Sequence, residues 1–320
     1  MSQSPRCIAL IDIGSARTKL LIARLGEEGD IEFERHKAES GIASDLDSSG
    51  ALSDEGRAKL RAAVVDLAAI AHQNECQSVY TFATDVIRRA TNTAMIINDL
   101  EEIAGPIAIL DPALEGALFL RAVRKAIPEQ SICAIDVGGG SVQIAWGDSE
   151  EKVVSIPTGT LRLEKDFQNQ GLSLVDECAK MTEYVSSVIE KSVPSDLHAD
   201  GIVLGSNCME DFIRSAMSVA GGIMTSYNGY LVTDIDSIAS LYQAILGKPY
   251  DMLTAYYPAN PRFMGGADKV LINLLALAKA VHATRVFATN ESVSTGLARL
   301  LLLAPREIRQ LGLWADQLSM

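Results

Sequence analysis

Two short segments of the sequence combine an aspartate with a glycine-rich turn. The first reads DIGS over residues 12–15, and the second reads DVGGGS over residues 136–141. Glycine lets the backbone approach an anion without a Cβ clash, and such a turn can point several N–H groups at one anion. An aspartate beside the turn can hold a hydrated divalent cation or orient a water molecule. The two segments predict paired phosphate-binding turns, with these candidate residues: Asp12 and Asp136 for a metal, and Gly14, Ser15, Gly138, Gly139, Gly140 and Ser141 for phosphate.

Each turn lies between two apolar runs of strand character. The first turn follows Cys7–Ile13 and precedes Leu20–Leu25, and the second follows Ser131–Val137 and precedes Val142–Trp146. Two apolar runs around a short Gly/Ser turn predict a β-hairpin. A Rossmann or P-loop site is excluded because it needs a strand, a glycine-rich turn and then a helix. The two aspartates are 124 positions apart (136 − 12), which favours a duplicated domain over a solenoid of short repeats.

The rest of the chain alternates helical and strand patterns, which predicts an α/β protein. Ser53 is a plausible N-cap for the first long helix. A polar break at Pro128-Glu129-Gln130 predicts a boundary between two domains, residues 1–128 and 129–320. We expect helices at 53–73, 92–104, 114–126, 174–191, 235–246, 267–281 and from 292, and strands at 78–83, 107–110, 201–204 and 285–288.

Composition limits the class of protein. The 320 residues include 28 Lys and Arg against 41 Asp and Glu, so the net charge is −13. With 48% hydrophobic and 22% charged residues, the chain is not of a disordered type. The acidic balance argues against a general nucleic-acid binder, and no apolar run is long enough to span a membrane. We expect no secretory signal, five reduced cysteines and a cytoplasmic location.

Several segments resemble the actin/Hsp70/sugar-kinase superfamily, and within it the exopolyphosphatase/guanosine-pentaphosphate phosphohydrolase (Ppx/GppA) family. The segment FATDVIRRATN at 82–92 is similar to that family's ATxxxRxAxN motif, and DVGGGS is similar to its DxGGGS loop. The resemblance covers roughly residues 7–303. Its weaker matches are LDSSGALSDE at 46–55, EGALFLRAV at 115–123, IPTGTLRL at 156–163 and RVFATNESVSTGLARLL at 285–301.

The resemblance implies two ribonuclease-H-like (actin-like ATPase) domains facing each other across a cleft. It implies hydrolysis of phosphoanhydride bonds in inorganic polyphosphate or guanosine pentaphosphate. Glu115 would act as general base on the attacking water, and Arg88 would bind phosphate oxygens. Mg²⁺ is the implied cofactor. The implied partners are a phosphorylated small molecule or polyphosphate, with no nucleic acid and no membrane, and a homodimer is left open.

Several segments depart from the family pattern. SAR at 15–17 replaces the usual SNS, Gln143 replaces a glutamate two residues after the second loop's serine, and the third loop, starting near Gly205, reads LGSNCMED. Gln143 remains a candidate phosphate contact, but an amide lacks the charge that holds a metal. These departures favour one alternative, a regulatory protein that binds a phosphorylated ligand without hydrolysing it. A second alternative from the same superfamily is an ATP-dependent sugar or acid kinase, which is less favoured because LGSNCMED lacks the glycine pair that an adenosine pocket tends to use.

Overall fold

The structure is a computed structural model that describes residues 6–124, 127, 131–148, 150–167, 171–314 and 317. The chain forms two compact units. Unit 1 contains Met1–Leu114 and Val293–Met320, and unit 2 contains Glu115–Ser292. The predicted boundary residues Pro128, Glu129 and Gln130 lie outside the described residues. The first compact unit ends at Leu114, and the C-terminal segment from Val293 belongs to it as well.

Unit 1 is built on a five-stranded sheet with the strand order β3-β2-β1-β4-β5. Strands β1, β2 and β3 pair antiparallel, whereas β4 and β5 continue the sheet in parallel. The predicted first hairpin is therefore confirmed. The elements of unit 1 are β1 (Cys7–Ile13), β2 (Thr18–Leu25), β3 (Ile31–Ala38), the 3₁₀ turn η1 (Ile42–Asp45), α1 (Asp54–Gln73), β4 (Ser78–Ala83), α2 (Asp85–Arg89), α3 (Thr93–Ala104), β5 (Ile107–Ile109), α11 (Val293–Leu303) and α12 (Pro305–Gln310).

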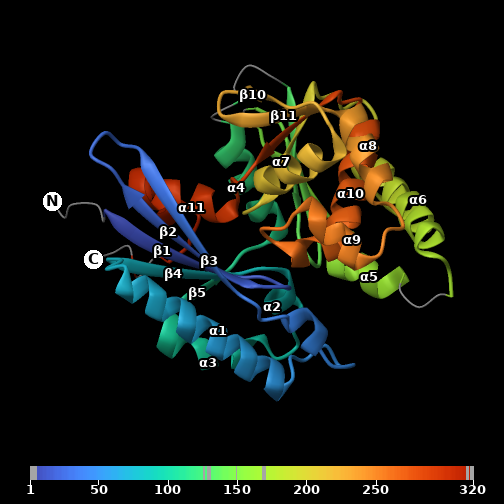
Figure 1. Ribbon diagram of the computed structural model, residues 1–320. Helices are drawn as coiled ribbons and strands as arrows, with labels where there is room; N and C mark the ends of the chain where they lie inside the picture. Colours follow the sequence, from blue (N-terminus) through green and yellow to red (C-terminus); the bar gives the residue numbers. More distant parts are fainter. Residues whose placement is uncertain are drawn as a thin grey trace. The chain divides into compact units, whose positions relative to one another are not determined.

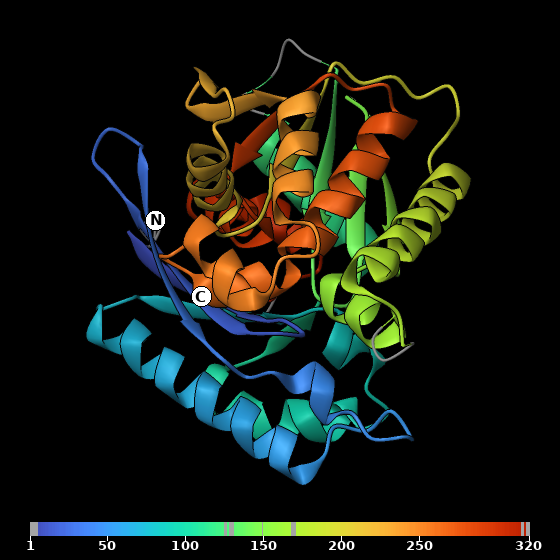
Figure 2. The same cartoon turned by 45° about the vertical axis from the view of Figure 1, so that its right-hand side comes forward.

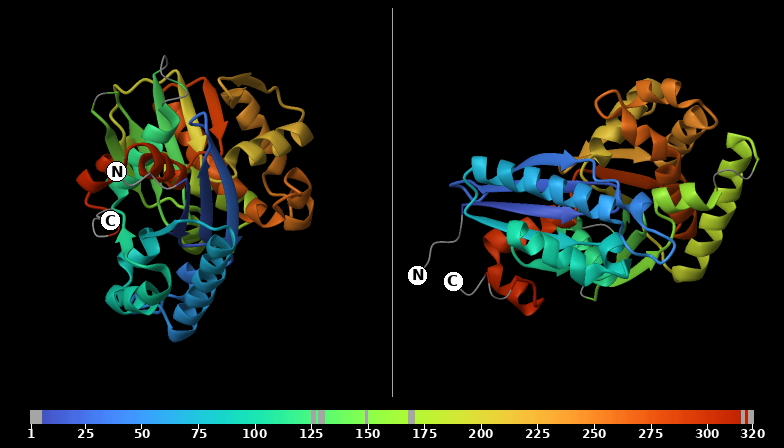
Figure 3. Two further views of the ribbon diagram at one scale, coloured as in Figure 1. Left: turned by 90° about the vertical axis from the view of Figure 1, so that its left-hand side faces the viewer. Right: turned by 90° about the horizontal axis from the view of Figure 1, so that it is seen from below.

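The side chains of β1 alternate between the two faces of the sheet, and helices cover both faces. Ala9, Ile11 and Ile13 pack into one core with α1 and α3, which lie side by side (Figure 3). Helix α1 begins as predicted, since the Ser53 hydroxyl accepts a hydrogen bond from the N–H of Gly56 at 3.1 Å. The alternate residues of β1, Asp12 among them, belong to the opposite face.

Helix α11 contacts β1 and β2 from the side opposite α1 (Figure 1). Trp314 continues this attachment, because its indole N–H donates to the Thr81 carbonyl at 3.0 Å. Its ring lies 5.2 Å from that of Tyr80. Residues that follow position 292 thus complete the core that the first hairpin begins.

Unit 2 is built on a seven-stranded sheet with the strand order β10-β11-β12-β9-β6-β7-β8. Its strands β8-β7-β6-β9-β12 repeat the directions of β3-β2-β1-β4-β5, which agrees with the predicted duplication. Its elements are α4 (Pro112–Arg124), β6 (Ile132–Val137), β7 (Val142–Trp146), β8 (Lys152–Ile156), α5 (Thr160–Phe167), α6 (Leu174–Ser192), β9 (Gly201–Gly205), α7 (Met209–Ala220), β10 (Thr225–Tyr227), β11 (Tyr230–Asp234), α8 (Ile235–Ile245), α9 (Tyr250–Leu253), the 3₁₀ turns η2 (Thr254–Tyr256) and η3 (Pro261–Gly266), α10 (Ala267–Ala280) and β12 (Arg285–Thr289).

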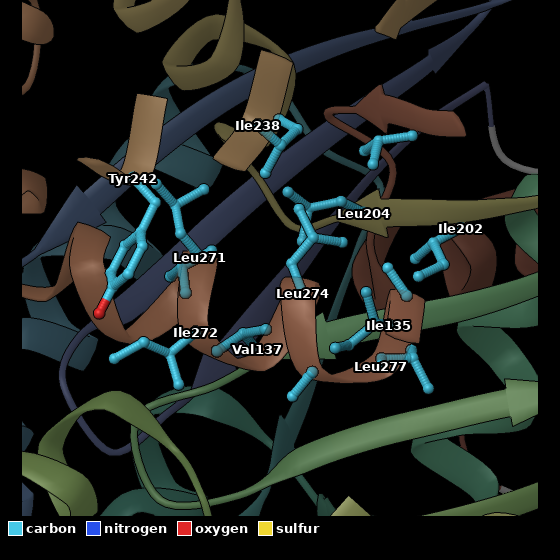
Figure 4. Packing of buried hydrophobic residues seen from close by; sticks show 14 of the residues in the cluster. Ile135, Val137, Ile202, Leu204, Ile238, Tyr242, Leu271, Ile272, Leu274 and Leu277 are labelled. Carbon is cyan, nitrogen blue, oxygen red and sulfur yellow. The ribbon is translucent and has the colours of Figure 1, made fainter. Parts of the chain in front are cut away.

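One face of the unit 2 sheet carries the main apolar core. Helix α10 contacts both α6 and α8 and lies between them (Figure 2). Ile135 and Val137 of β6 and Ile202 and Leu204 of β9 point toward these helices (Figure 4). At α10 and α8 they meet apolar side chains that include Leu271, Leu274, Leu277, Ile238 and Tyr242.

Helix α4 covers the opposite face of the unit 2 sheet. A methyl group at Gly205 would lie 2.2 Å from Phe119, and a methyl group at Gly116 would lie 2.4 Å from Val153. Two glycines therefore let α4 approach β8 and β9 closely. The predicted helix 114–126 is found as Pro112–Arg124, with Ala126 outside the described residues. In the described part of the chain, no helix is long and apolar enough to cross a membrane.

Candidate functional site

The first predicted turn closes the hairpin between β1 and β2. The N–H of Gly14 donates to the Arg17 carbonyl at 3.1 Å, and a methyl group at Gly14 would lie 3.0 Å from that oxygen. Asp12 and Lys19 are opposite one another in the hairpin, and the Lys19 Nζ lies 3.5 Å from Asp12 Oδ2. The hairpin register thus places a cation beside the candidate metal ligand.

A neighbouring segment fixes the carbonyls of this turn. The N–H of Ala43 donates to the Ser15 carbonyl and the N–H of Gly41 to the Ala16 carbonyl, each at 3.0 Å. Ser15 is buried. Within the described residues, no acceptor receives a hydrogen bond from the N–H of Ser15 or Ala16. These two N–H groups can therefore serve an anion.

Arg88 lies on α2, which begins directly after β4. Strand β4 runs parallel to β1, with Ala83 opposite Ile13, so the two strands end at the same edge of the sheet. The Arg88 guanidinium donates to the Leu110 carbonyl and lies 3.9 Å from the Asp85 carboxylate. Unit 1 thus brings Arg88 to the same sheet edge as the first turn.

The second predicted turn is tied to the start of α5. The N–H of Gly138 donates to the Ser141 carbonyl at 3.0 Å. The Gly138 carbonyl accepts from the N–H of Thr160 at 3.0 Å, and the Gly139 carbonyl accepts from the N–H of Leu161 at 2.9 Å. The first N–H groups of the helix, which lack intrahelical partners, are satisfied by the carbonyls of the turn.

The carbonyls of the turn are used by α5, whereas two of its N–H groups have no acceptor among the described residues. Among the described residues, no acceptor receives a hydrogen bond from the N–H of Gly139 or Gly140. Gly159 makes the contact with α5 possible, because a methyl group there would lie 2.5 Å from the Gly139 carbonyl oxygen. The second turn therefore presents donors in the manner expected of an anion-binding nest.

A row of polar side chains crosses the sheet beside the second turn. Asp136 is opposite Gln143, and Gln143 is opposite Ser155, so the three side chains share one face. Gln143 is only 4% exposed. Its Nε2 donates to Ser141 Oγ at 2.9 Å and to Ser155 Oγ at 3.3 Å. The buried amide thus joins the second turn to β8.

Glu115 belongs to the same side of the sheet. It lies in the first turn of α4, directly before Gly116, and it is 7% exposed. Gly116 approaches Val153, which lies two residues before Ser155 on β8. The two side chains therefore share the face that bears Asp136. The Asp111 carboxylate caps the helix by accepting from the N–H of Leu114 at 2.9 Å. Unit 2 therefore places Glu115, Asp136, Gln143 and the second turn on one side of its sheet.

The third predicted loop follows β9, whose Gly205 is opposite Asp136. Ser206 has a φ of 154°, in the region that favours glycine. The Asn290 side chain accepts from the N–H of Glu210 at 3.1 Å and joins this loop to the end of β12. Nothing among the described residues tests an adenosine pocket here, so the kinase alternative stays a prediction.

The two candidate carboxylates suit a metal ion whose remaining ligands are water and substrate oxygens. In the described part of the chain, no three His, Cys, Asp or Glu side chains form a cluster that could hold an ion. Mg²⁺ is commonly held by one or two carboxylates together with substrate phosphates and water. Asp12 and Asp136 each carry hard oxygen atoms of this kind.

Sequence reasoning missed three features of the site. Lys19 follows from the hairpin register, which a count from the first turn could have supplied. Ser155 was missed because β8 was not predicted, although KVVSI has β-branched character. The attachment of α5 to Gly138 and Gly139 has no signal in local pattern, since it depends on a backbone contact with Gly159.

Comparisons with known proteins identify the family of the chain. The profile of the Ppx/GppA phosphatase family matches residues 22–236. Exopolyphosphatase 1 of Mycobacterium tuberculosis is 28% identical over 166 residues, 50% of this chain and 48% of that protein. Exopolyphosphatase 1 of Mycobacterium leprae is 28% identical over 50% of this chain and 49% of that protein. The chain thus spans about half the length of the curated relatives that it matches.

Solved structures resemble the chain over nearly its whole length. An exopolyphosphatase from Cytophaga hutchinsonii has a TM-score of 0.80 at 18% identity and covers 92% of this chain and 97% of its own. An Aquifex aeolicus Ppx/GppA family member has a TM-score of 0.75 at 17% identity, with 94% and 98% covered. The expected fold of two actin-like domains is confirmed. With two thirds of its length matched by the family profile, the chain belongs to the Ppx/GppA phosphatase family.

Proposed function

We propose that this chain hydrolyses phosphoanhydride bonds in inorganic polyphosphate or guanosine pentaphosphate, with Glu115 as the general base. The position of Glu115 is the observation that carries this proposal. Its helix packs on the sheet face that bears Asp136 and Gln143, beside a turn with N–H groups available to an anion. The exopolyphosphatase names of the mycobacterial relatives support the class of substrate.

The chemistry requires little beyond these groups. Phosphoryl transfer depends mainly on positioning and on stabilising charge on the phosphate oxygens. The N–H groups of Gly139 and Gly140 would donate to those oxygens, with the Ser141 hydroxyl beside them. The Glu115 carboxylate would accept a proton from the attacking water, and its burial excludes competing bulk water. Arg88, in unit 1, is proposed to add a fixed positive charge.

Mg²⁺ is proposed as the cofactor, with Asp12 and Asp136 as its protein ligands. When bound, the ion would neutralise charge on the phosphate oxygens. The Lys19 ammonium beside Asp12 would then compete with the metal for that carboxylate. Phosphate release at graded Mg²⁺ concentrations, with Asp136→Asn and Asp12→Asn, tests both assignments.

The decisive experiment compares phosphate release by the wild type and Glu115→Gln, on polyphosphate and on guanosine pentaphosphate separately. A general base contributes about 10²- to 10⁴-fold, so Glu115→Gln should lower the rate by at least that lower value. Glu183→Gln is a matched control, because Glu183 is an exposed glutamate on α6. Equal rates in wild type and Glu115→Gln would exclude the assignment of the base.

Gln143 favours a second candidate, a regulatory protein that binds the phosphorylated ligand without turnover. Donor groups of the turn suffice for binding an anion, whereas the amide cannot act as a base or an anionic ligand. Gln143→Glu should then raise phosphate release by about 10²-fold. Brisk hydrolysis by the wild type, unchanged in Gln143→Glu, would eliminate the regulatory alternative.

A further inference from the structure

We propose that Gln143 makes this site bind a phosphate chain without a metal ion, by leaving the hydroxyl protons of Ser141 and Ser155 for the ligand. The inference rests on the proposed function, since it assumes that a phosphate chain occupies the second turn. It concerns the metal dependence of binding, which is separate from hydrolysis.

The side-chain amide of Gln143 is the donor in two hydrogen bonds to serine hydroxyls. The Gln143 Nε2 donates to Ser141 Oγ and to Ser155 Oγ, so both hydroxyl oxygens act as acceptors. A serine hydroxyl has one proton and two acceptor lone pairs. Within the described residues, neither hydroxyl has another hydrogen-bond partner. Each proton is therefore left for an outside acceptor such as a phosphate oxygen.

The two serines are more exposed than the glutamine that binds them. Gln143 is 4% exposed and fixed by its two bonds, whereas Ser141 is half-buried and Ser155 is exposed. The buried amide thus holds two reachable hydroxyls beside the available N–H groups of Gly139 and Gly140. The two hydroxyls and the two N–H groups are neutral donors, and donors of this kind can bind an anion.

A glutamate at position 143 would reverse this pattern. Carboxylate oxygens only accept hydrogen bonds, so the protons of Ser141 and Ser155 would turn toward residue 143. A third carboxylate would also join Asp136 and Glu115 on this face and repel a polyanion. A cation would then be needed to bring phosphate to the turn. Gln143 removes that requirement.

Binding of inorganic tripolyphosphate, measured by isothermal titration calorimetry with EDTA and with Mg²⁺, tests the inference. The wild type should bind in EDTA within about threefold of its affinity in Mg²⁺. Gln143→Glu should bind at least about tenfold more weakly in EDTA and recover most of the loss in Mg²⁺. Gln243→Glu, the same change on the exposed surface of α8, should bind like the wild type in both conditions.

Two further variants keep the test decisive. Gln143→Met has a similar shape without donor or charge, so it should lose part of the affinity in EDTA and gain nothing from Mg²⁺. Ser141→Ala should weaken binding equally in EDTA and in Mg²⁺. Circular dichroism of each variant identifies any loss of fold.

The outcomes separate this inference from the proposed hydrolysis. Equal affinities of wild type and Gln143→Glu in EDTA would overturn the inference, whatever the rate of phosphate release. A wild type that binds tripolyphosphate only with Mg²⁺ would also overturn it. Binding in EDTA by a protein that releases no phosphate would support the inference and contradict the hydrolase.

Discussion

Gly116 and Val153 meet where helix α4 crosses strand β8, and no side chain fits between them. A methyl group at Gly116 would lie 2.4 Å from Val153 Cγ1, 3.2 Å from Cγ2 and 3.4 Å from Cβ. The two Cγ contacts are closer than ordinary van der Waals contact, so the valine or the helix must shift to admit a methyl group. Because Glu115 directly precedes Gly116, this contact sets how closely the proposed base approaches its sheet.

We therefore expect Gly116→Val to lower the free energy of unfolding by about 1–3 kcal/mol, the usual cost of overpacking a core. Phosphate release should fall as well, because α4 must move away from β8. Urea denaturation measures the first effect. Adding Val153→Ala to Gly116→Val should recover part of the stability, and strictly additive losses would show that the two residues do not interact.

A second prediction concerns the buried pair of Thr158 and Asn273, both fully buried. The Thr158 hydroxyl donates to Asn273 Oδ1 at 2.7 Å, and Asn273 Nδ2 donates back to the Thr158 carbonyl at 3.0 Å. Asn273→Leu should lower the free energy of unfolding by about 1–3 kcal/mol, because it leaves buried groups unsatisfied.

Thr158→Val should have a similar effect, measured in urea. The double variant should lose clearly less than the sum of the two single losses, since it removes both ends of the side-chain bond. A sum that is fully additive would contradict the pairing.

A third prediction concerns the N-cap of α8. The Asp234 carboxylate accepts from the N–H of Ser237 at 2.6 Å, and the bonds from Ser237 hold the pKa of Asp234 below its usual value of 3.8. A depressed pKa stabilises the fold above the unfolded value, and the contribution is lost as pH falls through the folded pKa. Asp234→Ala should lower the free energy of unfolding by about 1 kcal/mol at pH 7.

This difference should shrink below about pH 4, where the carboxylate gains its proton. Asp234→Asn is the matched variant, since asparagine caps a helix without titrating. Its stability relative to Asp234→Ala should stay constant with pH. Thermal unfolding between pH 3 and pH 7 measures both differences, and a pH-dependent difference between the asparagine and alanine variants would refute this account.

A fourth prediction concerns three thiols. Burial raises the pKa of Cys133 to about 12 and that of Cys178 to about 11. Burial also raises the pKa of Cys76 to about 12, and the Cys76 sulfur lies 3.4 Å from that of Cys7. Groups with a raised pKa stabilise the fold below the unfolded value of about 9 and lose that contribution as pH rises toward the folded value.

Stability should therefore decrease between pH 9 and pH 11, by at most about 1.4 kcal/mol per pH unit for each thiol. Urea unfolding at several pH values measures the slope. Cys133→Ala should reduce the slope even though it also lowers stability at pH 7. An unchanged slope in that variant would show that Cys133 does not titrate on unfolding.

The hairpins and their turns were predictable because each depends on neighbouring residues, apolar runs on either side of Gly14 or Gly138. Strand β3 was missed, since its exposed and half-buried positions carry Glu32, Glu34 and other charged side chains. Periodicity detects the buried side of an element, and an edge strand of this kind has little of one.

The site was predictable in its residue types but not in its assembly. Asp136 and the second turn lie together in the sequence, whereas Glu115 joins them only through the contacts of α4 with β8 and β9. The partners of Gln143 were hidden for the same reason, since Ser155 approaches through strand pairing. Contacts between distant residues carry no local pattern.

The return of α11 to unit 1 has a consequence for synthesis on the ribosome. Unit 2 is continuous from Glu115 to Ser292, so it can fold as soon as its own residues have emerged. The strands of unit 1 are made first, yet β1 and β2 await α11, and Thr81 awaits Trp314. The unit that begins earlier is therefore completed later, and until then α11 does not cover the face of β1 and β2 that it contacts in the finished fold.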